Sequence, residues 1–280
     1  DKGVGDEHPH QLALTATPIP RSLAMVAYGD LDCSVIDELP PGRQPVTTTL
    51  MDHTRRDAVM RRVGNACREG RQAYWVCTAI EESDTLDIEA AEATLDQLQQ
   101  ALPDVQIGLV HGKLKPAEKA TVMAAFKAGE IQLLVATTVI EVGVDVPNAS
   151  LMIIDNAERL GLAQLHQLRG RVGRGAVDSH CLLLYRQPLS DTAQQRLKVM
   201  QESHDGFVIA EADLEIRGPG ELLGTRQTGL AAFRIALLPE HEPLLIEAQD
   251  IAARLYANDP SRAEALMQRW AGARADFARV

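Results

Sequence analysis

The chain has 280 residues, of which 45% are hydrophobic and 24% are charged. This length corresponds to about two domains, and the composition is ordinary for a globular protein, which excludes a wholly disordered or fibrous chain. The formal net charge of −11 predicts that the molecule as a whole repels nucleic acid, so any contact with DNA must come from a local patch.

No apolar run reaches membrane-spanning length, and no charged and then apolar leader opens the chain. We therefore expect a soluble, cytoplasmic protein with no membrane partner. The cysteines at positions 33, 67, 77 and 181 are spaced like neither a paired zinc site nor a disulfide framework, which predicts buried thiols and no bound metal. Because the chain starts at Asp1 without a methionine, we also expect a fragment.

The first forty residues are expected to contain a short strand, Leu12–Thr15, a helix, Pro18–Ala27, and a linker around Pro40 and Pro41. Farther along, apolar β-rich runs alternate with helical stretches, which predicts an α/β domain with a parallel sheet covered by helices, from about Val46 to Arg186. Its expected strands are Tyr74–Ala79, Val105–Val110, Ile131–Ala136, Leu151–Asp155 and His180–Tyr185, and its expected helices are Asp87–Leu102, Pro116 to about Gly129, and Leu162–Leu168.

Two further helices, Ser190–His204 and Gly206–Ile216, are expected to form a hairpin. A glycine-rich stretch, Gly218–Gly229, follows the hairpin, and a helical tail extends to Val280.

The densest chemical pattern is Gln164–Gly175, in which three arginines and three glycines fall within seven positions. Arginine forks match phosphate oxygens, and glycine lets a bulky anion approach the backbone, so the pattern favours phosphate binding. The alternative is a solvated helix end whose arginines complement the helix dipole. A dinucleotide-binding loop is excluded, because these glycines are spaced differently and follow a helix rather than a strand.

The segment Leu133–Pro147 is a second pattern, in which a strand runs into Thr137 and Thr138 and then a loop with Gly143 and Asp145. A carboxylate after a strand can accept ribose hydroxyls, and threonine hydroxyls can bind backbone phosphates. A buried strand with a capping aspartate is the alternative.

Other nucleotide-binding and metal-binding patterns are missing or incomplete. Gly112-Lys113 lacks the flanking residues of a phosphate loop, and Asp6–Pro9 has no strand before it, so we expect a polar loop there. His8 and His10 have no third ligand nearby. The six arginines from Arg55 to Arg71 form either a basic face or an ordinary solvated one.

Gln167–Arg174 resembles, position for position, the Gln-x-x-Gly-Arg-x-Gly-Arg motif of superfamily 2 helicases. Leu14–Pro18, His111-Gly112 and Thr137–Pro147 resemble three further motifs of these enzymes, in the expected order. Asp213–Gly229 is similar to the translocation motif that the RecG family of branched-DNA helicases shares with the transcription-repair coupling factor, and Asp32–Arg43 favours the RecG family.

This resemblance implies two RecA-like domains that hold ATP and Mg²⁺ between them. Residues 1–43 would be the end of the first domain with a linker, residues 44–187 the complete second domain, and residues 188–280 the translocation hairpin and tail. The phosphate loop and the acidic box that hold most of the nucleotide would lie upstream. The expected partner is branched duplex DNA, at forks and four-way junctions, and the expected state is a monomer.

The resemblance also implies roles for individual residues. Arg171 and Arg174 would bind the γ-phosphate and Gln167 would position them or the attacking water, while Gly143 and Asp145 would contact the nucleoside. The residues expected to grip DNA or to couple hydrolysis to its movement are Thr15, Thr17, His111, Gly112, Thr137, Thr138, Arg196, Arg217 and Gln227.

The implied function is ATP-dependent unwinding and branch migration of forked DNA in repair and recombination, with no activity in the fragment alone. One alternative is a duplex translocase like the coupling factor, which shares these motifs. Another is a helicase-like module that binds DNA without turnover. A dehydrogenase is disfavoured by the glycine spacing.

Overall fold

The computed structural model describes residues 12, 34, 36, 38, 45–78, 84–137, 146–175, 177–217, 241 and 243–271. The chain divides into two compact units: Val35–Ile216 and a second unit made of Asp1–Ser34 and Arg217–Val280. The first unit contains the α/β domain. The described part of the second contains helices α10 (Pro243–Asn258) and α11 (Pro260–Ala271), which confirms helices in the predicted tail.

Six parallel strands form one sheet in the order β1-β6-β5-β2-β4-β3. The strands are β1 (Thr47–Asp52), β2 (Gln72–Val76), β3 (Ile107–Val110), β4 (Leu133–Ala136), β5 (Ala149–Ile154) and β6 (His180–Tyr185). All of them end at one edge of the sheet, here called the carboxyl edge, and begin at the opposite edge, the amino edge. The predicted parallel α/β fold is therefore confirmed.

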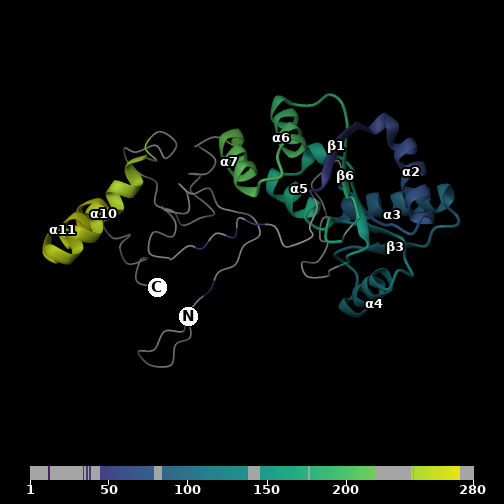
Figure 1. Cartoon of the computed structure of the whole chain (residues 1–280), viewed down its shortest axis with the longest axis horizontal. Helices are drawn as coiled ribbons and strands as arrows, with labels where there is room; N and C mark the ends of the chain where they lie inside the picture. The colour runs from purple at the N-terminus through teal and green to yellow at the C-terminus, as the bar shows by residue number, and fades with distance from the viewer. Residues whose placement is uncertain are drawn as a thin grey trace. The chain divides into compact units, whose positions relative to one another are not determined.

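Helices cover both faces of the sheet (Figure 1). In β2, Ala73 and Trp75 point into one core and Tyr74 and Val76 into the other, as the two-residue repeat of a strand requires. Helices α2 (Arg56–Arg68) and α3 (Asp84–Ala101) cover the first face; α4 (Pro116–Lys127), α5 (Leu162–Arg169), α6 (Asp191–Glu202) and α7 (Gly206–Arg217) contribute to the core of the second.

Local sequence signals explain where these elements begin and end. Pro116 is the first residue of α4, where its missing N–H costs no hydrogen bond, and Gly129 follows the helix with a φ of 80° that favours glycine. Ser190 caps α6 by accepting a hydrogen bond from the Ala193 N–H. The predicted strands and helices of the sheet domain are all present, with ends displaced by up to three residues.

Strand β1 was not among the predicted strands. It lies at the border of the sheet and pairs with β6 alone. Its sequence opens with three threonines and most of its residues are only half-buried, so its apolar signal is weak. The expected strand Leu12–Thr15, helix Pro18–Ala27, linker and glycine-rich stretch Gly218–Gly229 lie outside the described residues, apart from Leu12.

The cysteines of the described part of the chain are buried and free, as predicted for Cys67, Cys77 and Cys181, whereas Cys33 lies outside it. Burial raises the pKa of the Cys67 thiol to about 11 and the pKa values of Cys77 and Cys181 to about 12. No described helix combines the length and the apolarity that crossing a membrane requires.

Candidate nucleotide and nucleic-acid interface

Helix α5 and the loop after it carry the predicted phosphate-binding residues. Leu162, Leu165 and Leu168 are buried and fix the helix on the sheet, while Gln167 is exposed on the opposite side. Beyond the end of the helix, Arg171 is half-buried and Arg174 is exposed. The structure therefore presents the three predicted catalytic side chains on one helix end and its loop, outside the core.

Arg169, the first arginine of the Gln164–Gly175 pattern, has a different environment. Its side chain is buried, and Nη1 donates hydrogen bonds to the carbonyl oxygens of Met200 at 2.9 Å and Ser203 at 2.7 Å. Nη2 lies 3.2 Å from Nδ1 of His166, and burial lowers the pKa of Arg169. Since these oxygens belong to the last turn of α6 and its cap, Arg169 fastens α5 to α6 and is not available to a ligand.

Two glycines shape the loop after α5. Gly173 has a φ of 78°, a left-handed conformation that residues with a Cβ rarely adopt. Gly175 packs so tightly against the carbonyl oxygen of Pro147 that a Cβ there would clash with backbone. The loop of residues 170–175, here called the arginine loop, consequently lies beside the end of the Leu133–Pro147 segment. The tertiary structure thus brings together the two strongest patterns of the sequence.

The electrostatics of Arg171 suit a polyanion. Burial and the neighbouring Arg174 charge both lower the pKa of Arg171, because each disfavours its cationic form. Among the described residues, no carboxylate lies within 4 Å of the Arg171 guanidinium. A bound phosphate would relieve the repulsion between these two neighbouring cations, at least one of which has no acidic partner among the described residues.

The carboxyl edge holds the predicted DNA-binding residues of β3 and β4. His111 follows β3 and is half-buried, with an Nδ1 that has no described partner, and Gly112 is exposed. A Cβ at Gly112 would meet open space, so packing does not require glycine there. Thr137 follows β4, donates its N–H to the carbonyl oxygen of Val110, and has a side chain that is only 4% exposed.

A buried polar cluster that sequence reasoning missed also lies at the carboxyl edge. The Asp155 carboxylate accepts hydrogen bonds from Trp75 Nε1 at 2.7 Å and Arg56 Nε at 3.2 Å. The Arg56 guanidinium also lies 5.2 Å from the centroid of the Trp75 ring. The available signal was a lone aspartate at the end of an apolar strand, which by itself does not reveal that its partners lie 99 and 80 positions away.

The predicted coupling residues are placed only in part. The half-buried side chain of Arg196, on α6, donates hydrogen bonds to the carbonyl oxygens of Leu160 at 2.9 Å and Glu158 at 3.2 Å, just before α5. Arg217 is exposed at the end of α7. The remaining predicted residues, which lie outside the described part of the chain, are Thr15, Thr17, Thr138, Gly143, Asp145 and Gln227.

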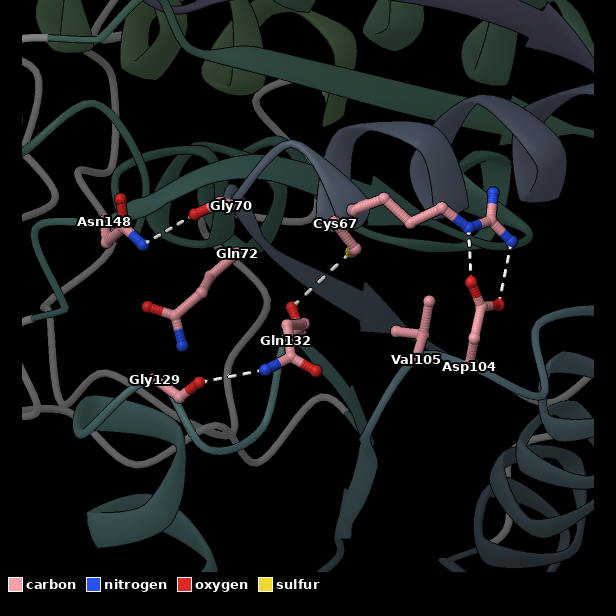
Figure 2. Close-up of a pocket in the computed structure, with 9 residues that line it drawn as sticks. Cys67, Gly70, Gln72, Asp104, Val105, Gly129, Gln132 and Asn148 are labelled. Atoms are coloured by element: carbon pink, nitrogen blue, oxygen red, sulfur yellow. Dashed lines mark hydrogen bonds and ion pairs between the residues drawn. The ribbon is translucent and has the colours of Figure 1, made fainter.

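A pocket of about 340 Å³ lies at the amino edge (Figure 2). Two amide side chains that line the pocket donate hydrogen bonds to the backbone. Asn148 Nδ2 donates to the Gly70 carbonyl at 3.0 Å, and Gln132 Nε2 donates to the Gly129 carbonyl at 2.9 Å. These side chains hold the segments before the strands together. No group of three or more His, Cys, Asp or Glu residues that could hold a metal is present in the described part of the chain.

Comparison with known proteins defines the class. Residues 55–176 match the family model of the helicase conserved C-terminal domain, and residues 203–269 match that of ATP-dependent DNA helicase RecG, domain 3, C-terminal. The sheet domain, with its arginine loop, is thus a RecA-like helicase C-terminal domain.

Relatives and a solved structure identify the family. The chain is 67% identical over 264 residues to ATP-dependent DNA helicase RecG of Escherichia coli (strain K12), covering 94% of this chain and 38% of the relative. It is 46% identical over 254 residues to RecG of Bacillus subtilis (strain 168), covering 90% and 37%. A structure of RecG bound to a three-way DNA junction matches with 45% identity and a TM-score of 0.66, covering 82% of this chain and 30% of that one.

Over the residues that it spans, the chain belongs to the RecG family. It spans about two fifths of the length of the curated relatives that it matches.

Proposed function

We propose that this chain forms part of the motor of an ATP-dependent helicase that unwinds and branch-migrates forked and four-way junction DNA in repair and recombination. The observation that carries the proposal is the pair Arg171 and Arg174, presented on a glycine loop in a chain of the RecG family. We also propose residues 1–43, 44–187 and 188–280 as the end of a first motor domain, the second motor domain, and the translocation hairpin with its tail.

Bound ATP with Mg²⁺ would supply the phosphoryl transfer whose free energy drives movement. In this chain, Arg171 and Arg174 would bind the terminal phosphate oxygens and stabilise the charge that develops during transfer. Gln167, exposed on α5 just before their loop, would orient them or the attacking water. Gly143 and Asp145 would contact the nucleoside.

The contacts of α6 support a route from the nucleotide to DNA. Arg196 of α6 binds the backbone before α5, and Arg169 of α5 binds the backbone at the end of α6. Helix α5 is therefore fastened to α6 at both of its own ends. A shift of the arginine loop would move α6, and the hairpin residues Arg217 and Gln227 would pass that movement to DNA.

DNA would be gripped through its backbone. Gly112 supports this role, because its exposed position has no packing reason for glycine and would let a phosphate approach the main chain. His111, Thr137 and Thr138 would contact the same strand, and Thr15 and Thr17 would link the DNA to the nucleotide cleft. Since Thr137 is buried, we expect it to contact DNA only after a local change that exposes its side chain.

The test uses a chimera in which this chain replaces the matching region of the 67% identical Escherichia coli relative. We expect the chimera to hydrolyse ATP with forked DNA and to unwind a synthetic four-way junction. Arg174→Ala should lower ATP turnover by roughly 10³-fold, the usual contribution of such an arginine, with DNA binding largely retained. The matched control is Arg62→Ala, an exposed arginine on α2.

Other outcomes separate the alternatives. In the chimera, Arg217→Ala should leave hydrolysis intact and abolish unwinding. Hydrolysis with displacement of a stalled polymerase but no junction unwinding would favour a coupling-factor-like translocase, and DNA binding without turnover would favour a non-catalytic module. The chain alone should show no ATP turnover, so full activity of the isolated chain would contradict the proposal.

A further inference from the structure

Arg186 occupies an unusual position at the carboxyl edge. It follows β6, and its two hydrogen-bond partners follow the strands on either side: His53 comes after β1 and Asn156 after β5. Nε donates to Asn156 Oδ1 at 2.9 Å, and Nη2 lies 2.9 Å from His53 Nε2. The Arg186 side chain nevertheless remains exposed, so its planar fork is held in one orientation while facing solvent.

Both partners of Arg186 are neutral. Arginine has no acceptor, so His53 Nε2 must carry no proton and accept the hydrogen bond. Burial and the Arg186 charge lower the pKa of His53, which keeps the ring uncharged at neutral pH. The charge of Arg186 is thus oriented without being cancelled, and among the described residues Nη1 has no partner.

Asn156 supports the arrangement at some conformational cost. It adopts a left-handed conformation, with φ of 50°, and its Nδ2 donates to the Thr78 carbonyl at 2.6 Å. Residues in such conformations concentrate at sites where surrounding structure enforces them for function. The Glu158 carboxylate accepts a hydrogen bond from the Arg186 backbone N–H and interacts electrostatically with its side chain, but it forms no ion pair with the guanidinium.

The surroundings of Arg186 add further positive charge. Arg55 and Arg159 end the short helical turns after β1 and β5, and both side chains are exposed. The carboxyl edge of a parallel sheet is where ligands bind in open α/β folds. At about 4.8 Å per strand, six strands extend over roughly 24 Å, along which a DNA duplex carries roughly fourteen phosphate charges.

We propose that Arg186, oriented by His53 and Asn156, binds a backbone phosphate of duplex DNA, with Arg55 and Arg159 as flanking cations. This inference rests on the proposed function. It adds a phosphate contact at β1, β6 and β5, which lies outside the helicase motifs and at the opposite end of the sheet from His111. A row of separate cations suits the repeating charge of a nucleic-acid backbone better than the clustered charge of one nucleotide.

The experiment measures binding of the whole chain to a labelled forked duplex by fluorescence anisotropy between 50 and 200 mM KCl. Arg186→Ala should weaken binding roughly five- to tenfold at 0.1 M salt and reduce the slope of log K against log salt by about 0.9, the value of one phosphate contact. Arg186→Lys keeps the charge but loses the fork, so it should fall between wild type and Arg186→Ala. Arg62→Ala makes the same charge change on α2 and should leave both quantities unchanged.

The outcomes separate this inference from the proposed function. Salt-dependent binding by wild type that Arg186→Ala does not alter overturns the inference and leaves the proposed function standing. No binding of the fork by wild type overturns both. A fluorescent ATP analogue provides a second probe. If Arg186→Ala lost binding of this analogue but kept its DNA affinity, Arg186 would bind a nucleotide phosphate rather than a DNA phosphate. If Arg186→Ala does not fold, Arg186→Lys provides the test: weaker binding than wild type supports the inference, and unchanged binding overturns it.

Discussion

At the amino edge of the sheet, Arg68 binds the Asp104 carboxylate through Nε at 2.6 Å and Nη2 at 2.9 Å. At the carboxyl edge, the partners of the Arg186 side chain among the described residues are an amide oxygen and an imidazole nitrogen. Both guanidinium groups have fixed orientations, but only the one at the amino edge is neutralised by its protein partner. The surplus charge therefore lies at the edge where parallel α/β sheets bind ligands.

The amides of the two edges differ in the same way. Gln72 and Asn148 at the amino edge donate to backbone carbonyl oxygens of segments that precede the strands, Gln72 to buried or half-buried acceptors and Asn148 to the exposed Gly70 carbonyl. Asn156 at the carboxyl edge also donates to a backbone carbonyl, that of Thr78, but it directs its oxygen to Arg186. We infer that polar residues at the amino edge stabilise the fold, whereas those at the carboxyl edge also prepare a binding surface.

The largest predicted effect is that of Asp155→Ala. The change leaves the buried Arg56 charge and the Trp75 N–H without their shared acceptor, and breaking a buried ion pair typically costs about 3–5 kcal/mol. Urea unfolding followed by circular dichroism would measure the loss. Asp104→Ala is the control, because that carboxylate is solvated at the amino edge, and equal losses in the two variants would refute a structural difference between the edges.

Gln72→Ala should have an intermediate effect. Gln72 is buried and its Nε2 donates to the carbonyl oxygens of Phe126 and Ile131, which would be left without this donor. We expect a loss of about 1–3 kcal/mol in the free energy of unfolding, with unchanged DNA affinity. Gln100→Ala, on the exposed face of α3, should stay within about 0.5 kcal/mol of wild type. A loss of DNA affinity in Gln72→Ala would assign binding to the amino edge as well.

The smallest effect concerns pH. The pKa of His53 is lowered in the folded state, so the unfolded state binds more protons below the ordinary histidine pKa of about 6.5. The free energy of unfolding therefore keeps its full value above pH 6.5. It decreases as the pH falls from there toward the lower pKa that His53 has in the folded state. Chemical denaturation between pH 8 and pH 5 should show this loss.

His53→Gln should make the pH dependence shallower without removing it. His204 also has a lowered pKa, through burial and the Arg169 charge, and its contribution would remain. An unchanged pH profile in His53→Gln would mean that the ring beside Arg186 titrates at its ordinary pKa.

Sequence periodicity predicted most of the sheet domain because its strands are short apolar runs bounded by helix signals. Strand β6 was predicted with its observed ends, whereas β1 was missed because it opens with three threonines and most of its residues are only half-buried. In the candidate site, the motif identified Arg171, Arg174 and Gln167 as side chains available to a ligand, and the structure leaves them accessible. Their catalytic roles remain a prediction.

The sequence by itself determined the fold class, the family and the phosphate-binding pattern, because repeats of two and 3.6 residues and short contiguous motifs are local properties. Only the tertiary structure showed what Arg169 does: it is buried against the end of α6, whereas Arg171 and Arg174, two and five positions later, are half-buried and exposed. Likewise, only the folding of the sheet brought His53 and Asn156 to Arg186, since these partners lie 133 and 30 positions away along the chain. The function of an arginine depends on its burial and on the charge of its partners, and both are set by contacts between residues distant in sequence.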